Sequence, residues 1–291
     1  MSNHHLNSGG KRLRALLTLE SAKLTGYDGD KRDINLAACV ELIHSATLLH
    51  DDVIDESELR RGVKTTNSIW GNQSSILVGD YLLSRCFEMM VEDGDLEILK
   101  LLSSTSAKIA QGEVLQLQHK GDADLLEETY IDIINLKTAS LFAAATKTGA
   151  CLSGSNDKEK KALESYGRNL GLAFQIADDA LDYYAKEKLF GKEIGKDFFE
   201  GKVTLPLITI FQKGNEEEKK FLKIVMKKEK RFEEDFKNTL TLINKYKAVE
   251  TTFKKAEYFV NVSFDALAIF PNTEDKKILQ NLTNFSLNRS F

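Results

Sequence analysis

Prolines are almost absent from this chain, and their scarcity constrains the fold more than any other feature. Pro206 and Pro271 are the only two among 291 residues. Because proline ends or kinks a helix, long helices can run here without interruption. Leu, Lys, Glu and Ala are abundant and favour helices. Apolar residues recur at helical spacing with no alternating strand pattern, so we predict an all-α fold.

The predicted helices cover most of the chain. They span residues 11–25, 35–55, 73–92, 96–120, 126–152, 157–186, 205–212, 216–227, 232–246, 248–269 and 273–286. The hydrophobic content of 42% allows one large domain or two ordinary ones, and no Pro- or Ser-rich linker marks a boundary. The highly charged stretch 216–237 is predicted to be a solvated surface helix.

Charge and cysteine usage narrow the functional classes. A formal net charge of −4 gives no general attraction to nucleic acid or to an anionic membrane. Cys39, Cys86 and Cys151 stand singly without CxxC spacing, which favours a reducing cytoplasm. The most apolar window, 141–152, contains Lys147 and is too short to span a bilayer, so any membrane contact is expected to be peripheral.

Two aspartate clusters of the same form each end an apolar, helix-like run. They are Asp51, Asp52 and Asp55, and Asp178, Asp179 and Asp182. In a helix, residues i and i+4 share a face and i+1 flanks them, so each cluster gathers three carboxylates. Negative charge at a helix carboxyl end also opposes the macrodipole. A divalent cation offsets both repulsions, and Mg²⁺ bound by carboxylates and phosphates indicates a diphosphate held from both sides.

Basic residues supply further candidates for binding phosphate. Lys11 and Arg14 lie three apart at a predicted helix start, where free N–H groups attract anions. The others are Arg60, Arg61, Lys137, Lys192 and Lys202. No P-loop, GxGxxG, HExxH or GxSxG pattern accompanies them, which leaves nucleotide-binding, zinc-protease and serine-hydrolase functions unsupported.

These residues, in this order, resemble the trans-polyprenyl diphosphate synthases of the isoprenoid synthase family. The resemblance covers essentially the whole chain. It is carried by Gly9-Gly10-Lys11-Arg12-Leu13-Arg14, Glu41-Leu42-Ile43-His44, Leu49-His50-Asp51-Asp52 through Asp55, Arg60-Arg61-Gly62, Gly79-Asp80, Gly112-Glu113, Lys137-Thr138, Phe174-Gln175 with the second aspartate cluster, and Gly191-Lys192 through Asp197 to Gly201-Lys202.

The resemblance implies a single domain over 1–291, with antiparallel helices around a deep central cavity, the aspartate clusters facing each other across its mouth, and a homodimer. It implies three Mg²⁺ ions per active site, with Asp179 as an indirect partner and as metal ligands Asp51, Asp52, Asp55, Asp178 and Asp182. The allylic diphosphate would contact Arg60, Lys137, Gln175, Lys192 and Lys202. Isopentenyl diphosphate would be held by Lys11, Arg14, His44 and Arg61.

The implied reaction needs no protein nucleophile. Metal ions and cationic side chains stabilise the departing diphosphate, so the allylic C–O bond ionises. The double bond of isopentenyl diphosphate attacks the resulting cation, and the released diphosphate accepts the proton that is lost. Thr138 and Gln175 would offer dipoles to the cation or serve structure alone.

Product length is expected to depend on the residues one turn before Asp51. Ala46 and Thr47 occupy these positions, where family members with short products tend to carry an aromatic residue. Small residues predict a C35 to C50 product, centrally C40, of the type that supplies quinone side chains. The alternatives are close packing at Ala46 and a pocket closed lower down by Phe87, Met89 or Met90, which would make the enzyme a farnesyl or geranylgeranyl diphosphate synthase.

The chain departs from the family pattern in two places. It begins eight residues before its Gly9-Gly10 motif, where the family has a further helix, and Ala15 replaces a common proline. Three rival interpretations remain. His44 with His50-Asp51 imitates an HD-type metal phosphohydrolase, the first aspartate cluster also occurs in class I terpene cyclases, and the short beginning would suit a non-catalytic subunit.

Overall fold

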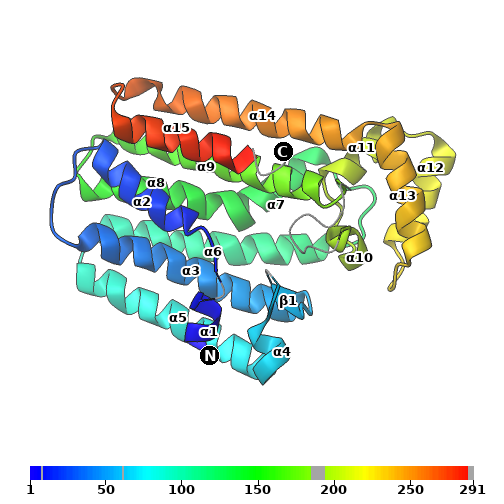
Figure 1. The fold of residues 1–291 in the computed structure, drawn as a ribbon, viewed down its shortest axis with the longest axis horizontal. Helices are drawn as coiled ribbons and strands as arrows, with labels where there is room; N and C mark the ends of the chain where they lie inside the picture. The colour runs from blue at the N-terminus through cyan, green and yellow to red at the C-terminus, as the bar shows by residue number, and fades with distance from the viewer. Residues whose placement is uncertain (8, 61, 185–193, 288–291) are drawn as a thin grey trace. The chain divides into compact units, whose positions relative to one another are not determined.

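The computed structural model describes residues 1–7, 9–60, 62–184 and 194–287, and these residues form an almost entirely helical protein (Figure 1). The helices are α1 (Ser2–Asn7), α2 (Leu13–Leu24), α3 (Arg32–Ile54), α4 (Thr66–Trp70), α5 (Asn72–Asp93), α6 (Leu96–Gln118), α7 (Glu127–Ile134), α8 (Ser140–Leu152), α9 (Asp157–Leu181), α10 (Lys196–Glu200), α11 (Leu205–Lys213), α12 (Glu216–Met226), α13 (Glu233–Lys245), α14 (Ala248–Ala266) and α15 (Glu274–Leu287). A π-helical segment, η1 (Asn135–Ala139), joins α7 to α8, and a 3₁₀ turn, η2 (Leu267–Ile269), follows α14. Strands β1 (Leu59–Arg60) and β2 (Val63–Lys64) pair antiparallel.

The all-α prediction is confirmed, and the long predicted helices lie within a few residues of their observed bounds. Short elements were missed, namely α1, α4, α10 and the hairpin, because they are too short to show a helical or alternating period. Two boundaries were wrong. The helix predicted over 157–186 ends at Leu181, and the helix predicted from Lys11 begins at Leu13, because Arg12 adopts a left-handed conformation with φ of 47°.

Contacts divide the chain into two compact units. The first comprises Met1–Ala107, Leu141–Gly167 and Ala266–Gln280, and the second comprises Lys108–Ser140, Arg168–Asp265 and Asn281–Phe291. The division falls inside helices such as α6 and α9. A single domain over 1–291 stays a prediction. Among the described residues, we find no helix with the length and apolar character needed to cross a membrane.

In the first unit, α3 and α5 pack antiparallel along their lengths. Near one end of the pair, Cys86 Sγ donates to Cys39 O at 3.4 Å, and near the other, Ser75 Oγ donates to Leu49 O at 2.9 Å. Gly79 permits the close approach, because a Cβ there would lie 2.4 Å from His50 Nε2. The end of α3 that carries the first aspartate cluster is therefore fixed against α5.

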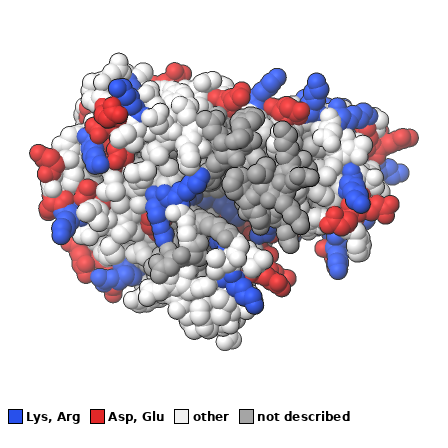
Figure 2. Space-filling view, in the orientation of Figure 1, with Lys and Arg blue, Asp and Glu red and all other residues white. Residues whose placement is uncertain are grey.

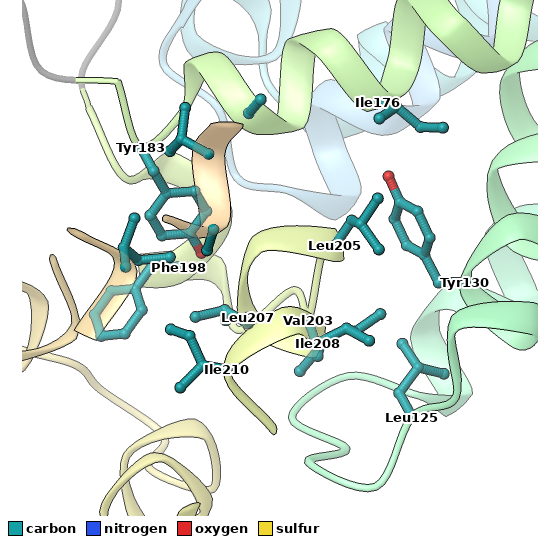
Figure 3. Packing of buried hydrophobic residues seen from close by; sticks show 14 of the residues in the cluster. Leu125, Tyr130, Ile176, Tyr183, Phe198, Val203, Leu205, Leu207, Ile208 and Ile210 are labelled. Carbon is teal, nitrogen blue, oxygen red and sulfur yellow. The ribbon is translucent and has the colours of Figure 1, made fainter. Parts of the chain in front are cut away.

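The second unit has an apolar core contributed by α7, α9, α10, α11 and α13 (Figure 3). Phe198, Leu207 and Ile210 are fully buried. Tyr130 packs its ring into the same core, and its hydroxyl points toward the helix that carries Ile176. This core positions both the π-helical segment and the end of α9.

Charged side chains of both signs intermingle over the surface (Figure 2), in keeping with the small net charge. In the segment 216–237, α12 begins with a capping box in which Asn215 accepts from Glu218 N, and Leu222, Val225 and Met226 are buried. The charged segment was predicted to be one solvated surface helix, but it comprises α12 and the start of α13, and α12 has one buried face.

Close packing of α8 on α2 generates a first prediction. A Cβ at Gly149 would lie 2.6 Å from both Ala22 N and Thr18 O, which are backbone atoms and cannot rotate away. We expect Gly149→Ala to lower the free energy of unfolding by about 1–3 kcal/mol in urea titrations. The control Lys108→Ala, at an exposed position of α6, should change it by less than about 0.5 kcal/mol. Equal effects of the two substitutions would contradict the packing argument.

Candidate functional site

The first aspartate cluster lies at the carboxyl end of α3. Asp51 and Asp52 belong to its last turn, and Asp55 is the residue after its end. Asp51 and Asp55 are half-buried, whereas Asp52 is 1% exposed. Asp52 Oδ1 accepts from Arg60 Nε and Nη2, both at 2.8 Å. The middle carboxylate is therefore engaged by the protein, and the outer two are nearer to solvent.

The segment that follows folds back onto this helix end. Asp52 O accepts from Ser57 N at 2.9 Å and from Asn67 Nδ2 at 3.1 Å, which satisfies a terminal carbonyl of α3. Thr65 Oγ1 donates to Ser57 O at 2.7 Å. His4 Nε2, from α1, lies 2.9 Å from Lys64 O. These contacts hold the hairpin that carries Arg60.

The second cluster lies at the end of α9 and repeats the same burial pattern. Asp178 and Asp182 are half-buried, and Asp179 is 3% exposed. Asp179 Oδ2 accepts from the Tyr130 hydroxyl at 2.6 Å, and Oδ1 accepts from Gln175 Nε2 at 2.8 Å. Thr138 Oγ1 donates to Gln175 Oε1 at 2.9 Å. In this cluster neutral donors replace the guanidinium that holds Asp52.

Negative charge is concentrated around the second cluster. Burial, followed by the charges of Asp197 and Asp178, raises the pKa of Asp182 to about 8, although backbone N–H groups oppose the shift. Burial and then Asp197 raise the pKa of Asp179 well above its usual range, while the hydrogen bonds from Tyr130 and Gln175 oppose this. Both shifts have the causes expected where carboxylates crowd together in a desolvated place.

Helix α10 connects this cluster to Lys202. Asp182 accepts from the backbone N–H groups of Lys196 at 3.1 Å and Asp197 at 3.0 Å. At the other end, buried Arg231 donates to Phe199 O at 3.2 Å and also to Met226 O. Its guanidinium lies where a Cβ on Gly201 would be, 2.6 Å from Nη2. Lys202 Nζ, next in the chain, is 2.6 Å from Glu200 Oε2.

Lys137 and Thr138 lie in the π-helical segment. Lys137 Nζ is 2.7 Å from Glu113 Oε1 and 2.8 Å from Gln116 Oε1, both on α6. Gly112 makes this approach possible, since a Cβ there would lie 2.6 Å from Lys137 N. π-Helical turns inside α-helices are frequent at functional sites. The segment directs Lys137 toward α6 and Thr138 toward α9.

The residues predicted to hold the diphosphate of isopentenyl diphosphate come from different elements of the chain. Lys11 is exposed and precedes α2, so the prediction that it lies on the first turn of that helix is wrong. Arg14 lies on α2 with its guanidinium 4.4 Å from the centre of the Phe142 ring. His44 is half-buried on α3. Arg61 and Lys192 lie outside the described residues.

The predicted chain-length residues differ in their surroundings. Ala46 is 2% exposed and packs with Leu49 and Leu82 between α3 and α5. Thr47 is half-buried, and its Oγ1 donates to His44 O at 2.8 Å. Ala46 therefore has neighbours that a larger side chain would displace.

His50 belongs to the pattern that imitates an HD-type phosphohydrolase. Its Nε2 lies 3.3 Å from Asp80 Oδ1 and from Ile76 O.

Within the part of the chain that the structure describes, no three His, Cys, Asp or Glu side chains converge as a preformed metal centre. Asp52 and Asp179 are buried inside the protein. Asp51, Asp55, Asp178 and Asp182 remain as the carboxylates nearer to solvent. Sequence reasoning missed Tyr130, Asp197 and Arg231 as parts of this site. Asp197 stood in a quoted motif, whereas Tyr130 and Arg231 carried no signal at sequence level.

The polyprenyl synthetase family model matches residues 1–243. The chain belongs to this family. It is 39% identical over 284 residues to the octaprenyl diphosphate synthase of Escherichia coli (strain K12), covering 98% of this chain and 87% of that protein. The family and the structural likeness confirm the resemblance, the isoprenoid synthase fold and the assignment as a prenyltransferase.

Solved structures of the family give the same result. The decaprenyl diphosphate synthase of Rhodobacter capsulatus has a TM-score of 0.94 at 42% identity, covering 99% of this chain and 88% of that one. A polyprenyl synthase of Caulobacter crescentus CB15, complexed with calcium and isoprenyl diphosphate, has a TM-score of 0.95 at 43% identity, covering 100% and 88%.

The buried pair at the first cluster generates a second prediction. Arg60→Met removes the guanidinium from Asp52, so we expect a loss of about 2–3 kcal/mol in the free energy of unfolding. Arg60→Met with Asp52→Asn should recover at least about 1 kcal/mol, because the buried carboxylate is gone. The control Arg85→Met breaks surface contacts to Glu88 and Glu92 and should cost less than about 1 kcal/mol. Similar losses for Arg60→Met and Arg85→Met would show that the pair does not stabilise the helix end.

Proposed function

We propose that this prenyltransferase is an all-trans polyprenyl diphosphate synthase that adds isopentenyl diphosphate repeatedly to an allylic diphosphate. The observation that carries the proposal is the repeated arrangement of the two clusters, in which the outer aspartates are half-buried and the middle one is held inside. Each cluster offers a pair of carboxylates at a helix end, which suits a cation bound jointly by protein and diphosphate.

The donor set fits Mg²⁺. Mg²⁺ prefers oxygen ligands, keeps several waters, and is usually bound by one or two carboxylates together with substrate phosphates. Asp51 and Asp55, and Asp178 and Asp182, supply such pairs, and the crowded charge around Asp182 is what a cation would offset. Asp52 and Asp179 then position the helix ends rather than bind metal directly. Three ions per site remain part of the proposal.

The chain's own residues supply cationic contacts and dipoles. When bound, Mg²⁺ acts as a Lewis acid on the diphosphate oxygens. Arg60, Lys137, Lys192 and Lys202 stabilise the departing diphosphate, and Glu113 and Gln116 hold the Lys137 ammonium in place meanwhile. Thr138 Oγ1 donates to Gln175 Oε1, and the dipoles of these two side chains would stabilise the positive charge that develops on the allylic carbon.

A second set of residues holds isopentenyl diphosphate for attack. It comprises Lys11, Arg14, His44 and Arg61. The packing of Arg14 on the Phe142 ring restrains the position of its guanidinium. Holding both substrates in one geometry removes much of the entropic cost of the encounter. The proton lost after condensation goes to the released diphosphate.

Assays of condensation test this function directly. With farnesyl diphosphate, labelled isopentenyl diphosphate and Mg²⁺, we expect labelled polyprenyl diphosphate and release of inorganic diphosphate only when both substrates are present. Removing the metal with EDTA should abolish both. Asp51→Asn with Asp55→Asn should lower kcat at least about 100-fold, because the charge on the leaving diphosphate is no longer offset.

The matched control is Asp124→Asn, an exposed aspartate paired with Lys223, which should retain wild-type turnover. Diphosphate release without isopentenyl diphosphate would favour a cyclase, and hydrolysis of phosphomonoesters would favour the HD-type phosphohydrolase. A wild-type protein inactive by itself but activated by another polypeptide would favour the non-catalytic subunit.

The long-chain product, C35 to C50 and centrally C40, is the second part of the proposal. Its support is the small side chain at Ala46, together with the octaprenyl and decaprenyl synthases that the chain resembles. Leu49 and Leu82 surround Ala46, so an aromatic residue there would need space from Leu82. The shorter-chain alternative requires Phe87, Met89 or Met90 to close the pocket, and Met90 is 1% exposed.

Product sizing tests this assignment. We expect Ala46→Tyr combined with Leu82→Ala to shorten the dephosphorylated product by two or more isoprene units at near wild-type turnover, because the ring blocks the growing chain. Leu82→Ala alone is the matched control and should not shorten it. An unchanged product distribution in the combined variant, with the fold intact by thermal melting, would refute the role of Ala46.

The remaining parts of the proposal concern context. Helix α5 exposes Leu77, Tyr81 and Val91 along one stripe, which supports the predicted homodimer. We also propose that the protein is cytoplasmic, that it contacts membranes peripherally to release its product, and that the product becomes a quinone side chain. Analytical ultracentrifugation would measure whether the protein is a homodimer.

A further inference from the structure

A chain of hydrogen bonds runs from the core of the second unit to the π-helical segment. It begins at the Tyr130 hydroxyl, passes through both carboxylate oxygens of Asp179 and both amide atoms of Gln175, and ends at Thr138 Oγ1. The donor–acceptor distances are 2.6, 2.8 and 2.9 Å. Tyr130, Asp179 and Thr138 are 2%, 3% and 7% exposed, and Gln175 is half-buried.

The chain has a defined direction. Asp179 Oδ1 is an acceptor, which requires Gln175 to present its NH₂ group to Asp179. Gln175 must then present its carbonyl oxygen to Thr138, and the Thr138 hydroxyl hydrogen points at Gln175. The free lone pairs of Thr138 Oγ1 therefore point elsewhere. This direction is the same whether or not Asp179 Oδ2 carries a proton, because Oδ1 faces Gln175 as an acceptor in both forms.

We infer that Tyr130 is a positioning residue that acts through Asp179 and Gln175 to keep the Thr138 oxygen negative toward the developing allylic cation. The inference rests on the proposed function, and it adds a residue and a dipole direction to that site. An oriented dipole stabilises a charge that forms in the transition state without reorganising during the reaction. A reversed Thr138 hydroxyl would present its hydrogen to the cation and raise the barrier instead.

Tyr130 determines which end of the group at position 179 faces Gln175. In the part of the chain that the structure describes, Asp179 is the acceptor for the Tyr130 hydroxyl. A buried hydroxyl hydrogen without an acceptor is costly, so an amide at position 179 would turn its oxygen toward Tyr130. Its NH₂ group would then face Gln175, which must flip and reverse the Thr138 hydroxyl.

Asp179→Asn tests this reversal. We expect its kcat for condensation to fall about 100-fold, with both KM values changed less than about threefold, because ground-state binding does not depend on the Thr138 dipole. Tyr130→Phe combined with Asp179→Asn should be at least about tenfold faster than Asp179→Asn alone. Without the tyrosine hydroxyl, the asparagine oxygen is free to face Gln175 and restore the original direction.

The comparison of these two variants is internally controlled. Both lack the charge of Asp179, so any effect of that charge on metal binding cancels between them. Tyr166→Phe provides a control for buried-hydroxyl loss, since Tyr166 is fully buried and donates to Leu279 O at 2.8 Å. It should cost stability and leave kcat unchanged. Thermal melting of each variant confirms that the compared proteins are folded.

The outcomes are distinct. A double variant as slow as Asp179→Asn, or slower, would overturn the inference, because removing the Tyr130 hydroxyl would then fail to restore the direction of the hydrogen bonds. A fall in activity carried by KM rather than kcat would also overturn it, since Asp179 would then serve substrate or metal binding. Absence of condensation in the wild type would instead overturn the proposed function, and recovery by the double variant would support the inference.

Discussion

Burial of the middle carboxylate in each aspartate cluster is the constraint on which the rest of the site depends. A carboxylate inside a protein is tolerated only where hydrogen bonds or an opposite charge compensate it. Asp52 is compensated by Arg60, and Asp179 by Tyr130 and Gln175. These compensating residues, Arg60 in one cluster and Tyr130 with Gln175 in the other, are the anchors of the two clusters. Each anchor fixes the end of a long helix and, with it, the two outer carboxylates. The geometry offered to a cation therefore depends on side chains that do not touch it.

The two anchors have different electrical consequences. Arg60 brings a positive charge to the first cluster, and it lies on a hairpin whose position depends on α1 and on the turn after α3. Tyr130 and Gln175 bring dipoles without net charge, so no cationic side chain offsets the buried carboxyl group of Asp179, and the charge of Asp197 helps to raise its pKa. Burial first, and then the charge of Asp197, raises the pKa of Asp182 to about 8.

The sequence predicted the fold class, the long helices and the clusters because these depend on local and repeated patterns. Scarce proline and helical spacing act over tens of residues, and the doubled spacing of the aspartates stands out in one dimension. It did not predict that Asp52 turns inward, since i, i+1 and i+4 positions look equivalent until packing decides which face is covered. Tyr130 and Arg231 were missed because their contacts depend on tertiary packing. Tyr130 lies 49 residues from its partner Asp179, and Arg231 holds carbonyls from α10 and α12.

The π-helical segment brings two neighbouring side chains into contact with two different helices. One extra residue in the turn places Lys137 against Glu113 on α6 and Thr138 against Gln175 on α9, although the two are adjacent in sequence. In an ordinary α-helix, neighbours project about 100° apart and their contacts are fixed by that angle. Gly112 removes the side chain that would block the approach of α6 to this turn. In the proposed reaction, consecutive residues would therefore supply a cation for the leaving diphosphate and a dipole for the developing carbocation, because their partners belong to different helices of the same unit.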